Sequence, residues 1–268
     1  MQTPSLSPCA STRPFSMDNT LSKILNLAAR LPRILSNPRL LRKITGTALG
    51  MSDEVMIPGC DLTRFPSIGL IGLIAECPEQ TRVTLALFPK FPCSISPLEA
   101  FSLAVLLAKS RAKRVFEFGT YLGISTSQLA LNIGDDGHVF TLDLPEDDPR
   151  VKLTIDDPTE MDLTSMRDKG RLIPADMQPK VTFIRQDSAS FDETPYLGSM
   201  DLVFVDGAHS ADYVSNDSTK GWRMLKQGGI IVWHDCCPQD PDVVRFLLAS
   251  PYQPKRIDNT SLAFAEKR

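Results

Sequence analysis

Residues 114–123, which read RVFEFGTYLG, decide the fold of this chain. The apolar run at the start is typical of a buried β-strand, and Glu117 lies close to its end. Two glycines follow, Gly119 and Gly123, which allow the backbone to turn tightly and to approach a ligand closely. We therefore expect a strand that ends in a ligand-binding turn.

Apolar strands and helical patterns alternate along the chain from Arg114 onward. Strands that are nearly continuous in Val, Ile, Leu and Phe, joined by helices, indicate a mostly parallel sheet buried on both faces. The fold class is therefore α/β, with a doubly wound sheet. Helices are expected at 94–110, 127–133, 214–226 and 241–250, and strands at 83–88, 114–119, 138–144, 180–187, 200–206, 228–235 and 261–267.

The N-terminal region differs from the rest of the chain. Residues 1–17 are rich in Ser, Thr and Pro and are expected to be disordered, 18–93 to form a helical extension with a lead-in strand, and 94–268 to form the main domain. Residues 1–50 carry seven basic groups against one acidic group, with apolar residues at helical spacing. We favour helices that pack on the domain or on a second subunit of a homodimer; a peripheral membrane contact and an organellar leader are the open alternatives.

The composition bounds the remaining classes of function. The formal net charge is only −3, so no nucleic-acid partner is expected, and the absence of an apolar run of 18 residues predicts no transmembrane segment. Six cysteines show neither metal-ligand spacing nor a disulfide framework, which favours a cytoplasmic protein with reduced thiols. The interval 145–180 is long and rich in Pro and Asp, and we expect a lid or a substrate-shaping insertion there.

Polar residues end each of the first three strands of the expected sheet, at the edge where parallel sheets bind ligands. Glu117 precedes a glycine turn that is not the G-x-G-x-x-G of a dinucleotide site, and a carboxylate there would repel a pyrophosphate. It suits instead a ligand with an ammonium and a sulfonium, such as S-adenosylmethionine. Asp143 is placed to accept hydrogen bonds from a ribose diol, and Asp187 with Ser188 to contact an adenine edge.

The next two strands end in Asp206 and in the pair His234 and Asp235. These three residues are candidate ligands of a divalent cation, Mg²⁺ or Mn²⁺, which would bind an acceptor hydroxyl and lower its pKa. His209, three residues after Asp206, is the candidate general base. The alternative is structural, with Asp206 capping the following helix and His234 pairing with Asp235 to fix a loop.

With these residues in view, the chain resembles the class I S-adenosylmethionine-dependent methyltransferases. Within that class it looks most like the bacterial group related to catechol-type and macrolide-sugar O-methyltransferases. The resemblance runs from about Ser94 to the C-terminus and rests on FEFGTYLGIST, MDLVFVDGAHS and LKQGGIIVWHD. It implies a Rossmann-like sheet of seven strands with an antiparallel last strand.

The resemblance also implies roles for individual residues. Asp143 matches the ribose-binding acid, Ser188 an adenine neighbour and Asp206 the first metal aspartate. His209 falls where these enzymes carry a catalytic lysine or, in sugar-modifying relatives, a histidine. One departure is His234, because the family's second metal position is usually an acid. The positions that match the cradle of the cofactor's methionine part are Glu117, Gly119, Tyr121 and Ser125, with Gly123 in the same turn.

We therefore expect an enzyme that transfers a methyl group to a small-molecule acceptor, most simply a hydroxyl oxygen of a sugar, a phenol or a polyketide. Two alternatives stay open at this point. One is an oxidoreductase that uses a nucleotide cofactor on the same fold, and the other is a non-catalytic protein that retains the cofactor pocket.

Overall fold

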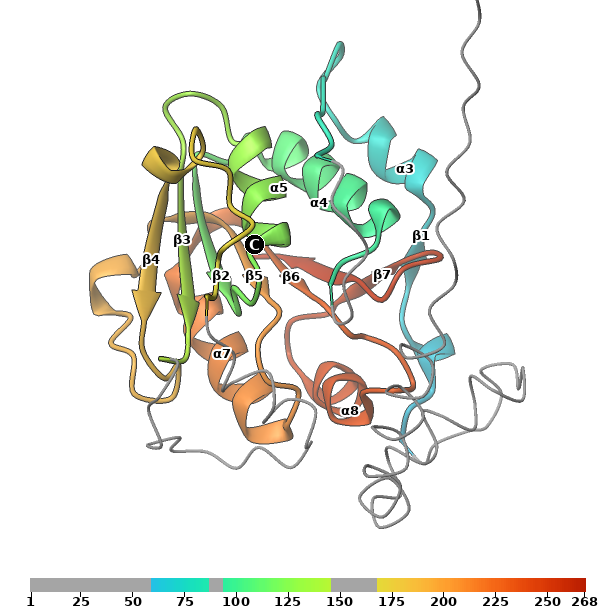
Figure 1. Cartoon of the computed structure of the whole chain (residues 1–268). Coiled ribbons are helices and arrows are strands. Elements are labelled where there is room, and N and C mark those ends of the chain that lie inside the picture. The colour runs from blue at the N-terminus through green and yellow to red at the C-terminus, as the bar shows by residue number, and fades with distance from the viewer. Residues whose placement is uncertain (1–58, 87–93, 146–167) are drawn as a thin grey trace, which may run out of the picture. The chain divides into compact units, whose positions relative to one another are not determined.

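The computed structural model describes residues 59–86, 94–145 and 168–268 (Figure 1). Within these ranges one sheet of eight strands forms the centre of the molecule. The expected α/β class with a mostly parallel sheet is confirmed, but the sheet has eight strands in place of the expected seven. Its strands are β1 (Ser67–Ile68), β2 (Arg114–Phe118), β3 (His138–Asp143), β4 (Val181–Arg185), β5 (Met200–Val205), β6 (Leu225–Trp233), β7 (Lys255–Ile257) and β8 (Ala263–Glu266).

The strand order explains where a ligand can bind. It is β1-β7-β8-β6-β5-β2-β3-β4, so the chain leaves β2 toward β3 and β4 on one side and returns to β5 and β6 on the other. Neighbouring strands are parallel except for β8, the last strand, which runs antiparallel to both β6 and β7. In a doubly wound sheet the crevice for a ligand lies where the order reverses, at the carboxyl ends of β2 and β5.

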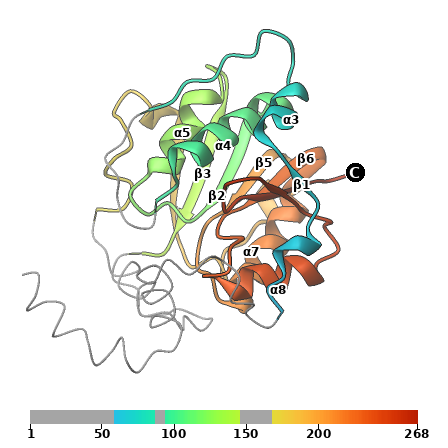
Figure 2. The ribbon, with the colours of Figure 1, turned by 90° about the vertical axis from the view of Figure 1, so that its right-hand side faces the viewer.

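Helices cover both faces of the sheet (Figure 2). α4 (Pro97–Ser110) and α5 (Ile124–Asn132) lie on one side, and α7 (Ala211–Met224) and α8 (Pro241–Ala249) on the other. Strand residues alternate between two apolar cores: Val115 packs with α4 and α5, whereas Phe116 packs with α7 and α8. This burial on both faces is why the strands read as continuous apolar runs.

Helix α4 begins as its sequence indicates. Ser96 is the N-cap and accepts the Glu99 N–H, while Glu99 Oε2 accepts the Ser96 N–H at 2.7 Å, which makes a capping box. Pro97 occupies the first turn, where its missing N–H costs nothing. The cap also fixes the Glu99 carboxylate at the edge of the sheet.

The expected strand at 83–88 is wrong over its described part, because residues 83–86 are not in a strand. Side chains of α5 hold this segment instead: the Thr84 N–H donates to Asn132 Oδ1 at 2.8 Å, and Gln128 Nε2 donates to the Thr84 carbonyl at 2.6 Å. Two amide side chains thus replace the strand neighbour that the alternating sequence predicted.

Residues 59–77 add to the sheet and its cores. β1 pairs with β7 in parallel, α3 (Leu70–Ala75) follows it, and the buried Phe65 and Leu73 belong to the two opposite cores. The expected division of the chain at residue 94 stays a prediction, and the expected N-terminal disorder and helices lie outside the described residues. The described ranges also contain three short 3-10 helices: η1 (Leu62–Arg64), η2 (Gln178–Lys180) and η3 (Thr194–Tyr196).

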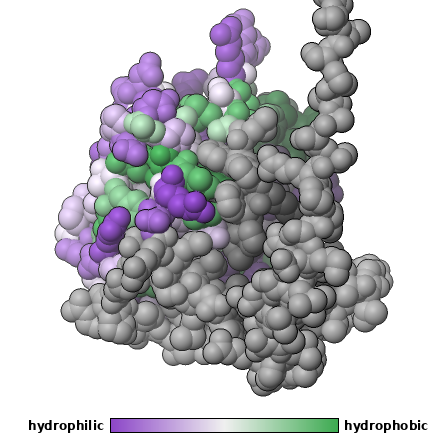
Figure 3. Space-filling model, in the orientation of Figure 1, coloured by the Kyte–Doolittle hydropathy of each residue, from purple (hydrophilic) through white to green (hydrophobic). Residues whose placement is uncertain are grey.

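The described surface carries both polar and apolar residues. Polar and apolar residues lie side by side on the described part of the face in Figure 3. The large apolar side chains exposed within the described ranges are Ile71, Ile74, Leu85 and Leu197. No described helix has the length and apolar character needed to cross a membrane.

Candidate active site

Backbone hydrogen bonds bring the expected site residues to one edge of the sheet. The Gly119 N–H donates to the Leu142 carbonyl at 2.8 Å, the Asp206 N–H to the Phe118 carbonyl at 2.9 Å, and the His234 N–H to the Val205 carbonyl at 3.0 Å. Each bond joins the residue just after one strand to the end of its neighbour. The residues that follow β2, β3, β5 and β6 therefore lie in one row.

The conformation and packing of the turn after β2 require its two glycines, whether or not a ligand is bound. Gly119 and Gly123 have φ values of +92° and +87°, which favour glycine. A Cβ on Gly119 would lie 1.9 Å from the Asp206 carbonyl oxygen, and one on Gly123 would lie 2.4 Å from Ile173 Cγ1. The sequence analysis attributed these glycines to the close approach of a ligand. At least in part, they allow other segments of the chain to approach the turn closely.

Glu117 is a buried carboxylate beneath the N-terminus of α5. Its Oε2 accepts hydrogen bonds from Thr126 Oγ1 at 2.5 Å and from Thr141 Oγ1 at 2.6 Å. Its Oε1 is buried without a hydrogen-bond partner among the described residues. Burial raises the pKa of Glu117 to about 7, although the hydroxyls of Ser125 and Thr126 oppose the rise. An unsatisfied buried oxygen of this kind calls for a donor from a ligand or water.

Asp143, the expected ribose acid, is already engaged. Its Oδ2 accepts the N–H groups of Thr120 at 3.0 Å and Tyr121 at 2.7 Å, which secures the turn after β2 to the end of β3. Its Oδ1 forms an ion pair with Lys169 Nζ at 2.6 Å. Sequence reasoning did not identify Lys169, because it lies within the interval read only as an insertion.

Asp187 and Ser188, which follow β4, form hydrogen bonds with side chains of α7. Asp187 accepts the Tyr213 hydroxyl at 3.0 Å and the Ala189 N–H at 2.9 Å. The Ser188 carbonyl accepts Lys220 Nζ at 2.6 Å and Asn216 Nδ2 at 3.1 Å. Both Asp187 and Ser188 are buried, so the segment beside the expected adenine position is rigid.

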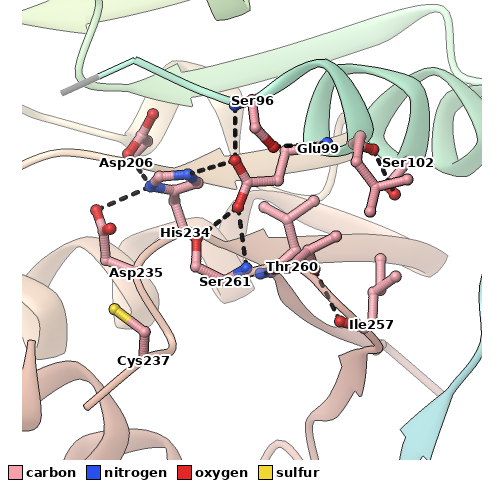
Figure 4. A network of polar contacts seen from close by, with 12 residues as sticks. Ser96, Glu99, Ser102, Asp206, His234, Asp235, Cys237, Ile257, Thr260 and Ser261 are labelled. Atoms are coloured by element: carbon pink, nitrogen blue, oxygen red, sulfur yellow. Dashed lines mark hydrogen bonds and ion pairs between the residues drawn. The ribbon is translucent and has the colours of Figure 1, made fainter. Parts of the chain in front are cut away.

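His234 lies among three carboxylates (Figure 4). Its Nδ1 is 2.8 Å from Asp235 Oδ2 and 3.1 Å from Asp206 Oδ1, and its Nε2 is 3.5 Å from Glu99 Oε2. Glu99 in turn accepts the N–H and the hydroxyl of Ser261 through Oε1, at 2.9 and 2.7 Å. The network therefore joins α4, the end of β6 and the loop before β8.

Electrostatics in this network favour a charged imidazole. Burial opposes the charge on His234, but Asp206 and Asp235 together hold its pKa well above the usual value. Burial would raise the pKa of Asp235, yet His234 and His209 hold it well below the usual value. Burial raises the pKa of Asp206, which His234 only partly offsets. Both nitrogens of a charged His234 are donors, and neither can bind a metal in that state.

His209 completes the cluster on its solvent side. Its Nε2 lies 2.8 Å from Asp235 Oδ2, and its Nδ1 lies 3.6 Å from Asp240 Oδ1. The ligand atoms of Asp206, His209 and Asp235 lie within 4.8 Å of one another, as a shared cation requires. The expected metal ligands Asp206 and Asp235 thus lie together. The third residue of this group is His209, whereas the sequence analysis expected His234 as the third ligand. The metal and the role of each residue stay predictions.

Sequence reasoning missed Glu99 and Asp240 as members of this cluster. Glu99 lies in the helix expected at 94–110, and its capping box explains it locally without any site. Asp240 precedes Pro241 and has the pattern of an ordinary helix start. Nothing local distinguishes either residue, since both reach the site through the tertiary fold.

The amino-acid sequence is similar to those of known methyltransferases. Residues 116–236 match a family model described as "Methyltransferase domain". The caffeoyl-CoA O-methyltransferase of Stellaria longipes is 28% identical over 143 residues, which cover 52% of each chain. A protein of Mycobacterium ulcerans named as an O-methyltransferase is 32% identical over 143 residues, covering 53% of this chain and 55% of that protein. The chain thus spans about half the length of the curated relatives it matches.

Among solved structures, the O-methyltransferase of Bacillus cereus in complex with SAH is 17% identical. The match covers 66% of this chain and 84% of that chain, with a TM-score of 0.46. The segment that matches the family model, residues 116–236, runs from within β2 to the residue after Asp235 and so includes the row of strand ends. Residues 116–236 of the chain are therefore similar to methyltransferase domains, and about half of the chain is similar to O-methyltransferases.

Proposed function

We propose that the protein transfers the methyl group of S-adenosylmethionine to a hydroxyl oxygen of a small-molecule acceptor. The single observation that carries this proposal is the row of acidic side chains at neighbouring strand ends, with the buried Oε1 of Glu117 lacking a donor. A ligand that brings an ammonium and a sulfonium to this row supplies the missing donor and places a positive charge beside Glu117.

The cofactor-binding residues are assigned from these contacts. Glu117 would accept the ammonium of the methionine part beneath α5, with Ser125 beside it, and the turn from Gly119 to Gly123 would pass along the cofactor. Asp143 would bind the ribose diol. Asp187 and Ser188 would border the adenine, on a segment that α7 holds rigid. The residue that stays ionised in the complex is Glu117, because the ammonium favours its charged form.

The acceptor would bind beside His209, which is the part of the cluster with the most exposed side chain at 28%. The acceptor oxygen attacks the methyl carbon in line with the carbon–sulfur bond, so that a carbon–oxygen bond forms as the carbon–sulfur bond breaks and the sulfonium becomes a thioether. The hydroxyl proton passes to His209, whose ring Asp235 orients at 2.8 Å. This makes Asp235 the partner that sets the orientation of the base.

The donor set also fits a divalent cation. Asp206, His209 and Asp235 would hold it, and two carboxylates with an imidazole suit Mn²⁺ better than Mg²⁺, which prefers oxygen ligands throughout. Such an ion would lower the pKa of the acceptor hydroxyl. His209 cannot serve one proton transfer as a base while it ligates the ion through the same nitrogen, so the two roles are alternatives that experiment separates.

Binding and turnover test the proposal in sequence. Adenosylhomocysteine should bind to the purified protein in calorimetry while NAD does not; the reverse result would favour a nucleotide oxidoreductase and overturn the proposal. Transfer of labelled methyl from S-adenosylmethionine should then be measured on a panel of phenols, catechols and sugar hydroxyls.

Histidine variants provide matched controls. His209→Ala should lower turnover by about 10²–10⁴-fold with adenosylhomocysteine affinity unchanged. His138→Ala should leave turnover unchanged, because His138 begins β3 at the opposite edge of the sheet, where its Nε2 contacts Thr182 Oγ1 at 2.8 Å. Full turnover of His209→Ala would show that His209 is not the base. Full turnover after chelation with EDTA would exclude a required metal. The cytoplasmic location and the homodimer stay predictions.

A further inference from the structure

Asp143 has little remaining capacity to bind a ribose. Its carboxylate offers about four acceptor positions. Two are taken by the backbone N–H groups of Thr120 and Tyr121, both on Oδ2, and a third by Lys169 Nζ on Oδ1. A ribose diol that binds through both hydroxyls needs two positions. One of the present donors therefore has to leave when such a ligand binds.

Lys169 is the donor that can leave. The two amide bonds are part of the turn after β2 and hold Asp143 in place without help from a side chain. Lys169, in contrast, reaches Asp143 with a long flexible side chain whose ammonium also donates to the Leu144 carbonyl at 2.8 Å. Removing it from Oδ1 breaks one ion pair and leaves the backbone of the turn intact.

The chain nonetheless places Lys169 firmly over Asp143. Its side chain is only 3% exposed. The next residues pair with the turn after β2, since the Gly170 N–H donates to the Tyr121 carbonyl at 2.7 Å and the Leu172 N–H to the Leu122 carbonyl at 3.0 Å. The segment 169–173 thus lies along that turn, and the ammonium occupies the side of Asp143 that the amides leave open.

We propose that Lys169 is a cofactor-site residue that competes with the ribose hydroxyls for Asp143 and thereby sets the affinity for S-adenosylmethionine. This inference rests on the proposed function, because it takes the ribose of the cofactor as the competitor. Binding exchanges the Lys169–Asp143 ion pair for hydroxyl–carboxylate hydrogen bonds. The exchange lowers the binding free energy that the ribose contributes. A lower affinity for the cofactor also allows the product, adenosylhomocysteine, to dissociate.

Lys169→Met tests the competition directly, because methionine keeps most of the apolar stem and removes the ammonium. Adenosylhomocysteine should bind the variant about tenfold more tightly by calorimetry, since Asp143 then lacks a donor that the ribose restores. The free variant should melt at a lower temperature than the wild type. Its gain in melting temperature on adding adenosylhomocysteine should be larger, because a ligand that binds only the folded state stabilises it by an amount that grows with the logarithm of the affinity.

Three further variants make the result specific. Lys180→Met removes a lysine from the same stretch, but one that contacts the Gly134 carbonyl and Asp135 near the start of β3, and it should leave the affinity unchanged. Lys169→Arg keeps the charge and should not gain affinity. In the Asp143→Asn background, Lys169→Met should no longer change the affinity, because the shared partner is gone.

The outcomes separate the two claims. Tighter binding by Lys169→Met alone, lost in the Asp143→Asn background, supports the competition. Weaker or equal binding by Lys169→Met overturns it and leaves the proposed function standing, with Lys169 as a residue that supports the turn. No binding of adenosylhomocysteine to any variant or to the wild type overturns the proposed function, and this inference with it.

Discussion

Glu99 Oε2 lies 3.5 Å from His234 Nε2, so a residue that caps a helix also faces the imidazole at the centre of the candidate site. The same carboxylate binds Ser261 through its other oxygen. His234 turns its second nitrogen to Asp206 and Asp235. Acidic residues on two opposite sides therefore set the orientation of the ring. Functional histidines are commonly oriented by such partners on the second ring nitrogen.

Glu99→Gln is expected to lower turnover about 10–100-fold, because glutamine removes the negative charge that faces His234, and its single oxygen can accept only one of the N–H groups of Ser96 and Ser261. Adenosylhomocysteine affinity should change little, whereas the melting temperature should fall, because the amide NH2 of glutamine cannot accept the second N–H. Turnover, calorimetry and thermal unfolding measure the three quantities. Burial would raise the pKa of Glu99, but His234 beside it holds that pKa well below the usual range, so the wild-type carboxylate is ionised at neutral pH.

Ser102→Ala is the matched control for that variant. Ser102 lies one turn further along α4, is fully buried, and donates to the Leu98 carbonyl at 2.8 Å without touching the site. It tests whether any disturbance of α4 lowers turnover. An equal loss of turnover in both variants would mean that Glu99 acts only through the stability of the helix.

The pKa of Glu117 predicts how cofactor affinity depends on pH. Its folded pKa is raised to about 7 from 4.5, chiefly by burial. The ammonium of adenosylhomocysteine binds the ionised carboxylate, so below pH 7 a proton has to leave first. Affinity should therefore rise by up to about tenfold per pH unit toward pH 7 and then level off. Calorimetry between pH 5.5 and 8.5 measures it, and Glu117→Gln should bind weakly with no such rise.

Two aspartates should show opposite effects of pH on stability. Burial raises the pKa of Asp217 to about 7. Its stabilising contribution is complete below the unfolded value near 3.8 and is lost as the pH rises through 7. Asp217→Asn keeps the shape without the charge, so relative to the wild type it should gain about 3 kcal/mol between pH 5 and 8.5. Denaturant unfolding at both pH values measures this.

The pKa of Asp201 is shifted in the opposite direction to that of Asp217, so Asp201 serves as the control. Burial would raise its pKa, but the hydrogen bond from Lys226 and those from the N–H groups of Lys113 and Arg114 lower it. Its contribution is present above pH 3.8 and is lost as the pH falls. Asp201→Asn should therefore be less stable than the wild type at pH 7 and closer to it at pH 3. A stability change of the same sign for both variants would contradict the assignment.

The two glycines of the turn should respond differently to alanine. Gly119→Ala places a Cβ against the backbone oxygen of Asp206, and a backbone atom cannot move aside without separating β2 from β5. Gly123→Ala meets Ile173 Cγ1, a side-chain atom. Both pay about 1–2 kcal/mol for a positive φ. Only Gly123→Ala should be partly rescued, by Ile173→Ala, in thermal unfolding; rescue of neither, or equal stability of both single variants, would contradict the steric account.

Much of the sheet was predictable because its strands are buried on both faces. The central strands β2 to β6 were all placed within a few residues, and so was the antiparallel β8. The short strands β1 and β7 were not predicted, because two or three residues carry no usable pattern of alternation. The alternating residues 83–86 gave a wrong strand, since their partners are the side chains of Gln128 and Asn132.

The sequence by itself determined that acids follow the strands of a parallel sheet, because hydrophobic periodicity marks where each strand ends and a parallel sheet brings those ends to one edge. Only the tertiary structure decided which groups those acids face. Lys169 beside Asp143 and Glu99 beside His234 come from segments that lie 26 and more than 130 residues away along the chain. The reason is physical: a charge buried in the fold needs a partner nearby in space, and the distance along the sequence does not limit which residue supplies it.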